Sequence, residues 1–111
     1  MAFLPPADNR GAAGIVVDDR LVAVTAWCPS DSDREVWWSG VLAVDPDYRG
    51  RRYGLRLKVH LLGEAERAGV RSVVSLVAFD NEPMLRLNAK LGGFKELRSS
   101  GATWLCTVPV G

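Results

Sequence analysis

Basic residues and glycines are concentrated in one short segment of this chain of 111 residues. Five of the 14 basic residues lie in ten consecutive positions, with Gly50 and Gly54 among them. The five are Arg49, Arg51, Arg52, Arg56 and Lys58. The segment follows an apolar strand and opens an amphipathic helix, whose first N–H groups have no intrahelical partner and lie at the positive end of the helix dipole. This combination predicts a site that binds an anion such as a phosphate group.

Other interpretations of the basic segment have less support. Its spacing is not that of a Walker A loop, because the Gly-Lys-Ser/Thr ending is missing, and it is not the GxGxxG pattern. A nucleic-acid surface is disfavoured, because the formal net charge is only +1 and few aromatic residues are interleaved with the basic ones. A solvated helix start is the alternative to an anion site. We therefore expect no nucleic-acid partner.

Hydrophobic patterning predicts the elements that would position this segment. Hairpins are expected at both ends of the chain, and a helix follows each of two inner strands. Pro83 fits the first turn of the second helix, where its missing N–H costs nothing. The predicted elements are a hairpin of 15–17 and 21–28, a strand at 35–44, a helix at 51–68, a strand at 70–79, a helix at 81–91, and a hairpin of 94–97 and 102–108.

The order of these elements predicts the fold class. The strand, helix and strand of residues 36–79 should form a parallel crossover, whereas the hairpins pair antiparallel. We therefore expect an α/β (α+β) fold, with a mixed, mostly antiparallel sheet and two helices packed on it. The length fits one domain, which we place at residues 14–111 after an extended lead-in at residues 1–13.

Residues 49–54 and residues 81–94 together resemble two motifs of the GNAT acyltransferase superfamily. Residues 49–54, Arg-Gly-Arg-Arg-Tyr-Gly, are similar to its pyrophosphate-binding pattern Arg/Gln-x-x-Gly-x-Gly/Ala, except that Arg52 stands where the first glycine belongs. Residues 81–94 are similar to its Asn-x-x-Ala/Met…Lys-Leu-Gly-Phe segment, with one extra glycine before Phe94. With the strand between them, the motifs cover residues 41–94 in the family's order. The resemblance implies a GNAT-like acyl-CoA N-acyltransferase fold.

The resemblance also implies a cosubstrate, acetyl-CoA or coenzyme A. In the family, the strand before the loop pairs its backbone with the pantetheine arm, and the amides of the loop hold the diphosphate. Asn81 would bind near the pantetheine or cap its helix. The implied binding residues are Leu42, Val44, Arg49, Gly50, Arg51, Arg52, Tyr53, Gly54 and Asn81.

The implied reaction is transfer of an acetyl group from acetyl-CoA to an amine of an unknown acceptor, by direct attack in a ternary complex. Asn88 stands where many members have a tyrosine that protonates the departing thiolate; an amide cannot supply that proton, although it can hydrogen-bond to a sulfur. Glu35, in the strand that leads to the loop, is a candidate general base. The alternatives are a helix-surface or capping residue for Asn88 and a solvated strand-end charge for Glu35. These departures keep a second function open, a catalytically degenerate CoA-binding or structural domain.

Several other residues are expected in structural positions. Cys28 and Cys106 are interpreted as buried free thiols, and His60 as a helix-surface residue. Trp37 and Trp38 are neighbours on a strand and must face opposite sides of the sheet. The sequence offers no set of metal ligands, so no metal is expected.

The N-terminus has no signal-peptide pattern, and no apolar run reaches the roughly 20 residues of a membrane span. We therefore expect a cytoplasmic protein without a membrane partner. Compared with the GNAT pattern, the chain is expected to lack the first strand and the first two helices. Sheet surface exposed in this way is a liability unless something covers it. This predicts a homodimer or a partner domain.

Overall fold

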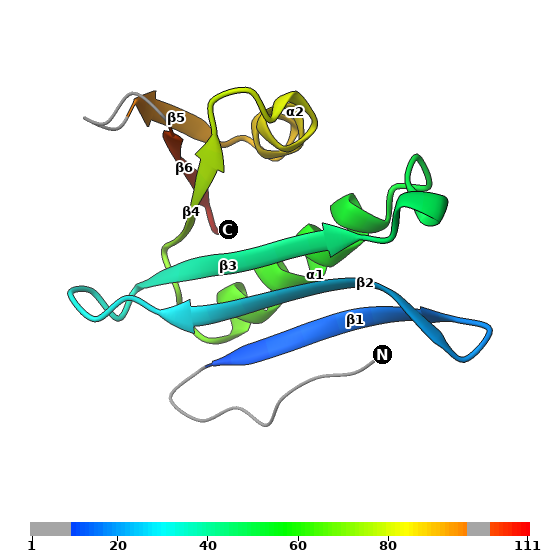
Figure 1. Ribbon diagram of the computed structural model, residues 1–111. Helices are drawn as coiled ribbons and strands as arrows, with labels where there is room; N and C mark the ends of the chain where they lie inside the picture. Colours follow the sequence, from blue (N-terminus) through cyan, green and yellow to red (C-terminus); the bar gives the residue numbers. More distant parts are fainter. Residues whose placement is uncertain (1–9, 98–102) are drawn as a thin grey trace.

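The computed structural model describes residues 10–97 and 103–111 of the chain. Within these ranges it holds a six-stranded sheet in the order β1-β2-β3-β4-β6-β5, with helices packed against it (Figure 1). Neighbouring strands are antiparallel except for β3 and β4, which are parallel, so the expected fold class is confirmed. The strands are β1 (Gly11–Val17), β2 (Arg20–Pro29), β3 (Val36–Val44), β4 (Ser72–Ala78), β5 (Phe94–Leu97) and β6 (Thr103–Pro109). The helices are the 3-10 turn η1 (Pro46–Tyr48), α1 (Tyr53–Arg67) and α2 (Glu82–Lys90).

A two-residue turn joins β1 to β2. Asp18 and Asp19 adopt the left-handed backbone conformation, with φ of 50° and 64°. Two such residues give a tight turn whose twist matches that of the flanking strands. The predicted first hairpin is confirmed. β1 nevertheless begins at Gly11, so residues 11–13 belong to the sheet and not to the predicted lead-in, whose residues 1–9 lie outside the described ranges.

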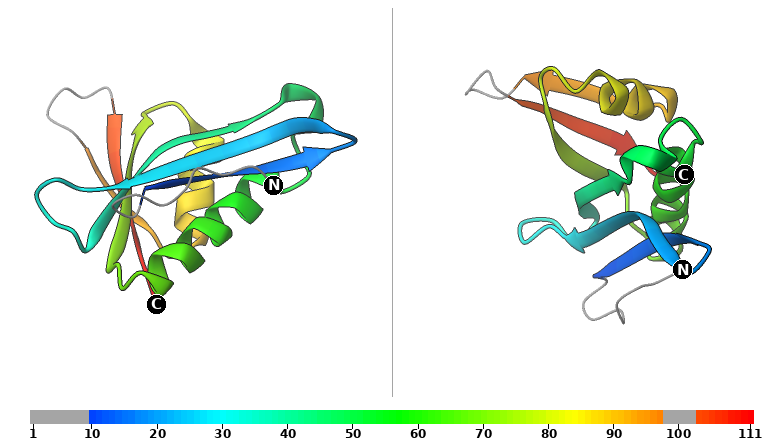
Figure 2. Two further views of the ribbon diagram at one scale, coloured as in Figure 1. Left: turned by 90° about the horizontal axis from the view of Figure 1, so that it is seen from below. Right: turned by 45° about the vertical axis from the view of Figure 1, so that its right-hand side comes forward.

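α1 covers one face of β1, β2 and β3 and builds the main core there (Figure 2). Its buried apolar residues are Leu57, Leu61 and Ala65. Trp37 of β3 is 2% exposed and stacks on Trp27, with 5.9 Å between the ring centroids. Trp38 faces the other side of the sheet and is half-buried, as the alternation of side chains along a strand predicts.

The sheet divides between β3 and β4. The two strands pair at three positions, Val36 with Ser72, Trp37 with Val73, and Trp38 with Val74. β3 stays paired with β2 as far as Val44, and β4 stays paired with β6 as far as Ala78. Beyond the third pair, β3 and β4 therefore diverge and leave a wedge between the two halves of the sheet (Figure 1).

α2 begins as its sequence predicts. The Asn81 side chain caps it by accepting a backbone N–H at 3.3 Å, and Pro83 lies in the first turn. Leu85 of α2 packs against Val77 and Cys106 in a smaller core on the other half of the sheet.

The C-terminal hairpin of β5 and β6 is also confirmed. Its predicted turn at residues 99–101 lies outside the described ranges. Cys28 and Cys106 are both free thiols; Cys106 is buried as predicted, whereas Cys28 is half-buried.

The helices leave part of the sheet uncovered. On the strands, large apolar side chains stay exposed at Val16, Leu21, Val41, Leu76 and Phe94. No helix in the described part of the chain is long and apolar enough to cross a membrane. The homodimer or partner domain expected to cover the sheet stays a prediction.

Candidate functional site

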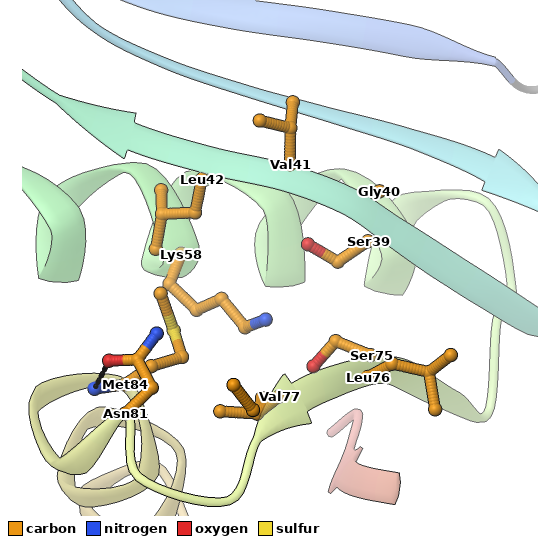
Figure 3. Close-up of a pocket in the computed structure, with 11 residues that line it drawn as sticks. Ser39, Gly40, Val41, Leu42, Lys58, Ser75, Leu76, Val77, Asn81 and Met84 are labelled. Carbon is orange, nitrogen blue, oxygen red and sulfur yellow. Dashed lines mark hydrogen bonds between the residues drawn. The ribbon is translucent and has the colours of Figure 1, made fainter. Parts of the chain in front are cut away.

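A cavity of about 140 Å³ opens where β3 and β4 separate (Figure 3). It begins directly after Trp38 and Val74, the last residues that pair across the two strands. Its lining comes from residues 39–42 of β3, residues 75–78 of β4, Lys58 of α1, and Asn81 and Met84 at the start of α2. Lys58 is the one ionisable side chain in this lining, as far as the described residues go. The divergence of two parallel strands therefore creates a partly polar cavity.

A β-bulge lies beside the cavity on β3. Ala26 of β2 pairs with Val41, and Trp27 pairs with Ser39, so the pairing skips Gly40. A bulge of this kind bends its strand locally. The bend occurs at the level where the wedge begins.

The backbone of β3 presents polar groups that do not pair with β4 along one side of the wedge. Successive residues of a strand point their N–H and C=O groups to opposite edges. Asp45 donates its N–H to a β2 carbonyl at 2.7 Å, and the Val41 carbonyl accepts a β2 hydroxyl at 2.7 Å, so odd-numbered residues here face β2. Leu42 and Val44 therefore turn their backbone groups toward the wedge, where β4 no longer pairs with β3.

The segment after β3 is held against the end of the strand by hydrogen bonds. Asp45 caps η1 by accepting a backbone N–H at 2.9 Å, and its other oxygen pairs with Arg20 at 2.6 Å. Arg49 donates from Nε to the carbonyl oxygen of Val44 at 3.2 Å. These contacts fix the loop at the open end of the wedge.

The N-terminus of α1 is open. Arg52 precedes it with a φ of 64°, and the first helical hydrogen bond runs from the Arg56 N–H to the Arg52 carbonyl at 3.0 Å. The N–H groups of residues 53–55 thus have no helical partner. Among the described residues no side chain caps α1, and its first turn carries no acidic residue, unlike the start of α2. Free N–H groups and the helix dipole both favour an anion here.

Arginines and tyrosines surround this helix start. The rings of Tyr48 and Tyr53 stack with 6.5 Å between their centroids. The Arg51 guanidinium lies 4.9 Å from the Tyr48 centroid, and the Arg56 guanidinium lies 5.8 Å from the Tyr53 centroid. Contacts of this kind hold a cation over a ring face. The structure thus brings the predicted loop residues, 49–54, together at the open end of the wedge.

Lys58 does not belong to this exposed group, although the sequence places it in the same basic segment. It is 2% exposed, and its side chain reaches from α1 into the cavity (Figure 3). Burial lowers the pKa of its amino group. Helical spacing carried the missed signal, because Lys58 follows Leu57 directly and precedes Leu61 by three positions, which is the buried face of α1.

Asn88 is buried, but it is not part of the cavity lining. It is 3% exposed, and neither Oδ1 nor Nδ2 has a hydrogen-bond partner among the described residues. Its interpretation as a helix-surface residue is therefore wrong. Buried amides normally have hydrogen-bond partners, so the side-chain amide of Asn88 is an unsatisfied buried polar group. A catalytic part for Asn88 stays a prediction.

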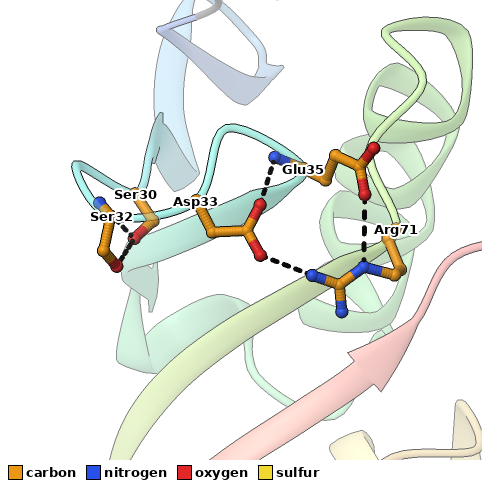
Figure 4. A network of polar contacts seen from close by, with 5 residues as sticks. All are labelled: Ser30, Ser32, Asp33, Glu35 and Arg71. Atoms are coloured by element: carbon orange, nitrogen blue, oxygen red, sulfur yellow. Dashed lines mark hydrogen bonds and ion pairs between the residues drawn. The ribbon is translucent and has the colours of Figure 1, made fainter.

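Glu35 lies away from the cavity. Arg71, directly before β4, bridges it to Asp33: Nε of Arg71 is 3.4 Å from Oε2 of Glu35, and Nη2 is 2.5 Å from Oδ2 of Asp33 (Figure 4). The Glu35 side chain is 67% exposed and precedes the three paired positions of β3, whereas the cavity follows them. The structure agrees with a solvated strand-end charge and gives no support to Glu35 as a base at the cavity.

His60 is half-buried, not fully on the surface as expected. Its ring centroid lies 6.4 Å from that of Trp27, and its Nε2 lies 3.7 Å from Glu64. In residues 10–97 and 103–111, no three His, Cys, Asp or Glu side chains gather as a metal site.

Comparison with known families decides what this chain is related to. The sequence model of the acetyltransferase (GNAT) family matches residues 3–94. The chain belongs to the GNAT family of acetyltransferases. Both GNAT motifs, at residues 49–54 and 81–94, lie within the matched range. A comparison with curated protein sequences finds no match.

Solved structures with the GNAT fold superpose on this chain. The GNAT-family acetyltransferase from Streptococcus pneumoniae gives a TM-score of 0.85 over 95% of this chain and 69% of that one, at 16% identity. The PaiA N-acetyltransferase from Thermoplasma acidophilum, in complex with coenzyme A, gives a TM-score of 0.78 over 88% of this chain and 59% of that one, at 15% identity. An acetyltransferase from Bacillus subtilis, in complex with CoA, gives a TM-score of 0.78 over 92% of this chain and 78% of that one, at 12% identity. At such identities the likeness establishes the GNAT fold.

The departure from the GNAT pattern at Arg52 has a structural meaning. Its φ of 64° lies in the left-handed region, which glycine adopts without the steric cost that a side chain brings. The pattern has glycine at this position, and here an arginine takes up a conformation that glycine adopts more easily.

Proposed function

We propose that this GNAT protein transfers an acetyl group from acetyl-CoA to the amine of an acceptor, by direct attack in a ternary complex. Membership of the GNAT family implies acyl transfer from CoA. The observation that carries the proposal is the wedge between β3 and β4, which connects an open helix N-terminus to a polar cavity along an unpaired strand edge. The helix N-terminus would hold the diphosphate of the cosubstrate, the strand edge its amide-bearing arm, and the cavity its thioester.

The diphosphate is assigned to the loop at the open end. The free N–H groups at the start of α1 point their positive ends at this position. Gly50, with a φ of 80°, shapes the loop before them. Arg49, Arg51 and Arg52 are exposed there and supply the charge. Because these arginines are exposed, we expect salt to screen their contribution.

The pantetheine arm is assigned to the open edge of β3. The backbone groups of Leu42 and the N–H of Val44 would pair with its amides, as an added strand pairs with a sheet edge, while the Val44 carbonyl accepts from Arg49. Asn81 borders the same cavity, and because its Oδ1 already accepts the Met84 N–H at 3.3 Å, its Nδ2 is left to donate to the arm.

The reaction requires the acceptor nitrogen to meet the thioester carbonyl carbon as a neutral amine. The nitrogen–carbon bond forms, the carbon–sulfur bond breaks, and CoA leaves as a thiolate that takes up a proton. Among the described residues that line the cavity, no carboxylate, imidazole or phenol is present to move these protons. We therefore assign both proton transfers to water.

That same lining supports a second candidate function, a CoA-binding domain without catalysis. Asn88 replaces the proton donor of the GNAT pattern, and Glu35 is engaged with Arg71 at the far end of β3. The two functions share CoA binding and differ only in turnover.

Binding and turnover, measured separately, test the two candidates. Titration calorimetry with CoA and acetyl-CoA should show binding that weakens as salt rises. CoA release from acetyl-CoA, followed with a thiol reagent across a panel of amines, should show turnover on at least one of them. A sample without acetyl-CoA corrects for the protein's own thiols. Binding without turnover on any amine favours the second function, and absence of binding overturns both.

The proposal includes a second copy of the chain, or a partner domain, over the uncovered part of the sheet. The exposed apolar side chains of β4 and the loop after it, Leu76 and Phe79, support such a contact. The molar mass in solution tests it, and a stable monomer at micromolar concentration contradicts it.

A further inference from the structure

Lys58 is an unexpected group on the buried face of α1. The other buried residues of this helix are Leu57, Leu61 and Ala65, whereas Lys58 buries a long amine-bearing side chain at 2% exposure. Its amino group enters the cavity beyond the last β3–β4 pair, on the side of Ser39 and Ser75 (Figure 3). No ion pair within the described part of the chain involves this amine.

The surroundings of Lys58 favour the uncharged amine. β3 and β4 present the hydroxyls of Ser39 and Ser75, the start of α2 presents the amide of Asn81, and no carboxylate lines the cavity among the described residues. Burial is the main influence and lowers the pKa of Lys58, while the Cys106 thiol of β6 acts in the opposite direction. The neutral, nucleophilic form of this amine is therefore more accessible than in an exposed lysine.

The position of this amine coincides with the far end of the proposed cosubstrate. With the phosphates on the loop, the arm follows β3 inward past Val44 and Leu42, and the acyl thioester arrives at the closed end where Lys58 lies. We propose that Lys58 is a self-acylation site, whose Nζ takes the acyl group from bound acyl-CoA when no acceptor amine is present. This inference rests on the proposed function, because a buried amine meets the thioester only through a wedge that holds CoA.

The chemistry is that of the proposed reaction with Lys58 in the place of the acceptor. The lone pair of Nζ attacks the thioester carbonyl carbon, a nitrogen–carbon bond forms, and the carbon–sulfur bond breaks. The departing CoA thiolate ends as a thiol with the proton that Nζ loses. The products are an amide on Lys58 and free CoA, so atoms and charges balance without a further reagent.

The modified side chain would change the site. An amide carries no charge, so the unpaired buried amine is removed. The added acyl group occupies part of a cavity of only about 140 Å³. Acylated protein should therefore bind acetyl-CoA more weakly than unmodified protein. The modification would thus inhibit the site when acceptor is scarce.

The chain offers an internal comparison, because its three lysines are Lys58, Lys90 and Lys95. Lys90 and Lys95 are exposed, whereas Lys58 is buried. The full chain is incubated with acetyl-CoA without acceptor, digested, and each lysine is followed by mass spectrometry over time. Because bound acetyl-CoA presents its carbonyl to one amine, we expect Lys58 to be labelled at least about tenfold faster than Lys90 or Lys95.

Two controls separate directed from random labelling. Acetic anhydride needs no wedge, so it should label Lys90 and Lys95 before the buried Lys58. An excess of desulfo-CoA, which fills the wedge without a thioester, should suppress labelling of Lys58 and leave the other two unchanged. Lys58→Arg should lose the rapid label.

The outcomes distinguish this inference from the proposed function. CoA binding with Lys58 labelled no faster than Lys90 and Lys95 overturns the inference alone. Label on a serine or cysteine in place of Lys58 overturns it as well. If CoA does not bind at all, the proposed function fails and the inference fails with it.

Discussion

Trp38 of β3 pairs with Val74 of β4, and this is the last residue pair before the two strands separate. Everything proposed for the site follows from that relationship. Past this pair, β3 turns polar backbone groups that no longer pair with β4 toward the wedge, and Lys58 reaches the space between the strands from α1. Continued pairing of β3 with β4 would have left neither an open strand edge nor a cavity.

An alanine at position 54 tests the match of residues 49–54 to the GNAT pattern. A Cβ there would lie 3.8 Å from Cδ2 of Leu42 and 3.9 Å from Cδ2 of Leu87, which are ordinary contacts, so Gly54→Ala should fold normally. The GNAT pattern accepts glycine or alanine at this position, so calorimetry should show CoA affinity unchanged in Gly54→Ala. Gly63→Ala makes the same change farther along α1, where its Cβ would meet the Arg67 guanidinium at 3.8 Å, and should also leave affinity unchanged. A loss of affinity in Gly54→Ala alone would contradict the match of residues 49–54 to the pattern.

Glycine at position 52 tests the strain in the loop. Because Arg52 has a φ of 64°, Arg52→Gly should raise the free energy of unfolding by about 1 kcal/mol. Arg56→Gly, in the interior of the same helix, should instead lower it by about 1 kcal/mol. Chemical denaturation measures both changes, and opposite signs are the expected result. A loss of stability in Arg52→Gly would show that the arginine side chain stabilises the fold by more than the strain of its left-handed backbone conformation.

Removal of two loop charges tests the anion site. The double variant Arg49→Ala and Arg51→Ala should lower CoA affinity by about tenfold at low salt, with a difference from wild type that shrinks as salt rises. Arg67→Ala with Arg86→Ala removes the same charge from exposed side chains that pair with Glu64 and Glu82. This control should bind CoA as the wild type does. Calorimetry at two salt concentrations compares them, and equal affinity of the loop variant and the wild type would refute the assignment.

Methionine at position 58 tests the cost of burying the amine. Burial lowers the pKa of Lys58 below its ordinary value of 10.5, so the folded state disfavours the protonated form. The unfolded chain then binds more protons between the two pKa values, and wild-type stability rises with pH across that interval. Lys58→Met should lack this rise and gain on the order of 1 kcal/mol in unfolding free energy at neutral pH.

Denaturation at several pH values up to the ordinary lysine pKa of 10.5 provides the measurement for Lys58→Met. Burial raises the pKa of Cys106, which removes stability at higher pH in wild type and variant alike, so the difference between the two proteins reports Lys58. Lys90→Met, an exposed position at the end of α2, is the control and should follow the wild-type pH dependence. A parallel pH dependence for Lys58→Met and the wild type would mean that the amine is hydrated in the folded protein.

The elements themselves were largely predictable because their signals are local. Strand alternation, the proline at the start of α2 and the Asn81 cap all act within a few residues. The start of β1 was missed because its small residues carry no periodic signal of their own. Gly11 belongs to the strand through its pairing with Trp27, whose ring lies so close that a Cβ on Gly11 would be 2.4 Å from Cζ2. That contact joins residues far apart in sequence.

The amino-acid sequence by itself determined the loop of residues 49–54 and its place at the start of a helix, because glycines, charges and helix ends act locally. The tertiary structure decided the rest of the site. It buried Lys58 and Asn88, and it set Glu35 at the paired end of β3, away from the cavity. These outcomes depend on where β3 and β4 stop pairing and on which face of each helix meets the sheet. Packing between residues far apart in sequence sets the end of the β3–β4 pairing and the buried face of each helix. No short stretch of sequence contains that information.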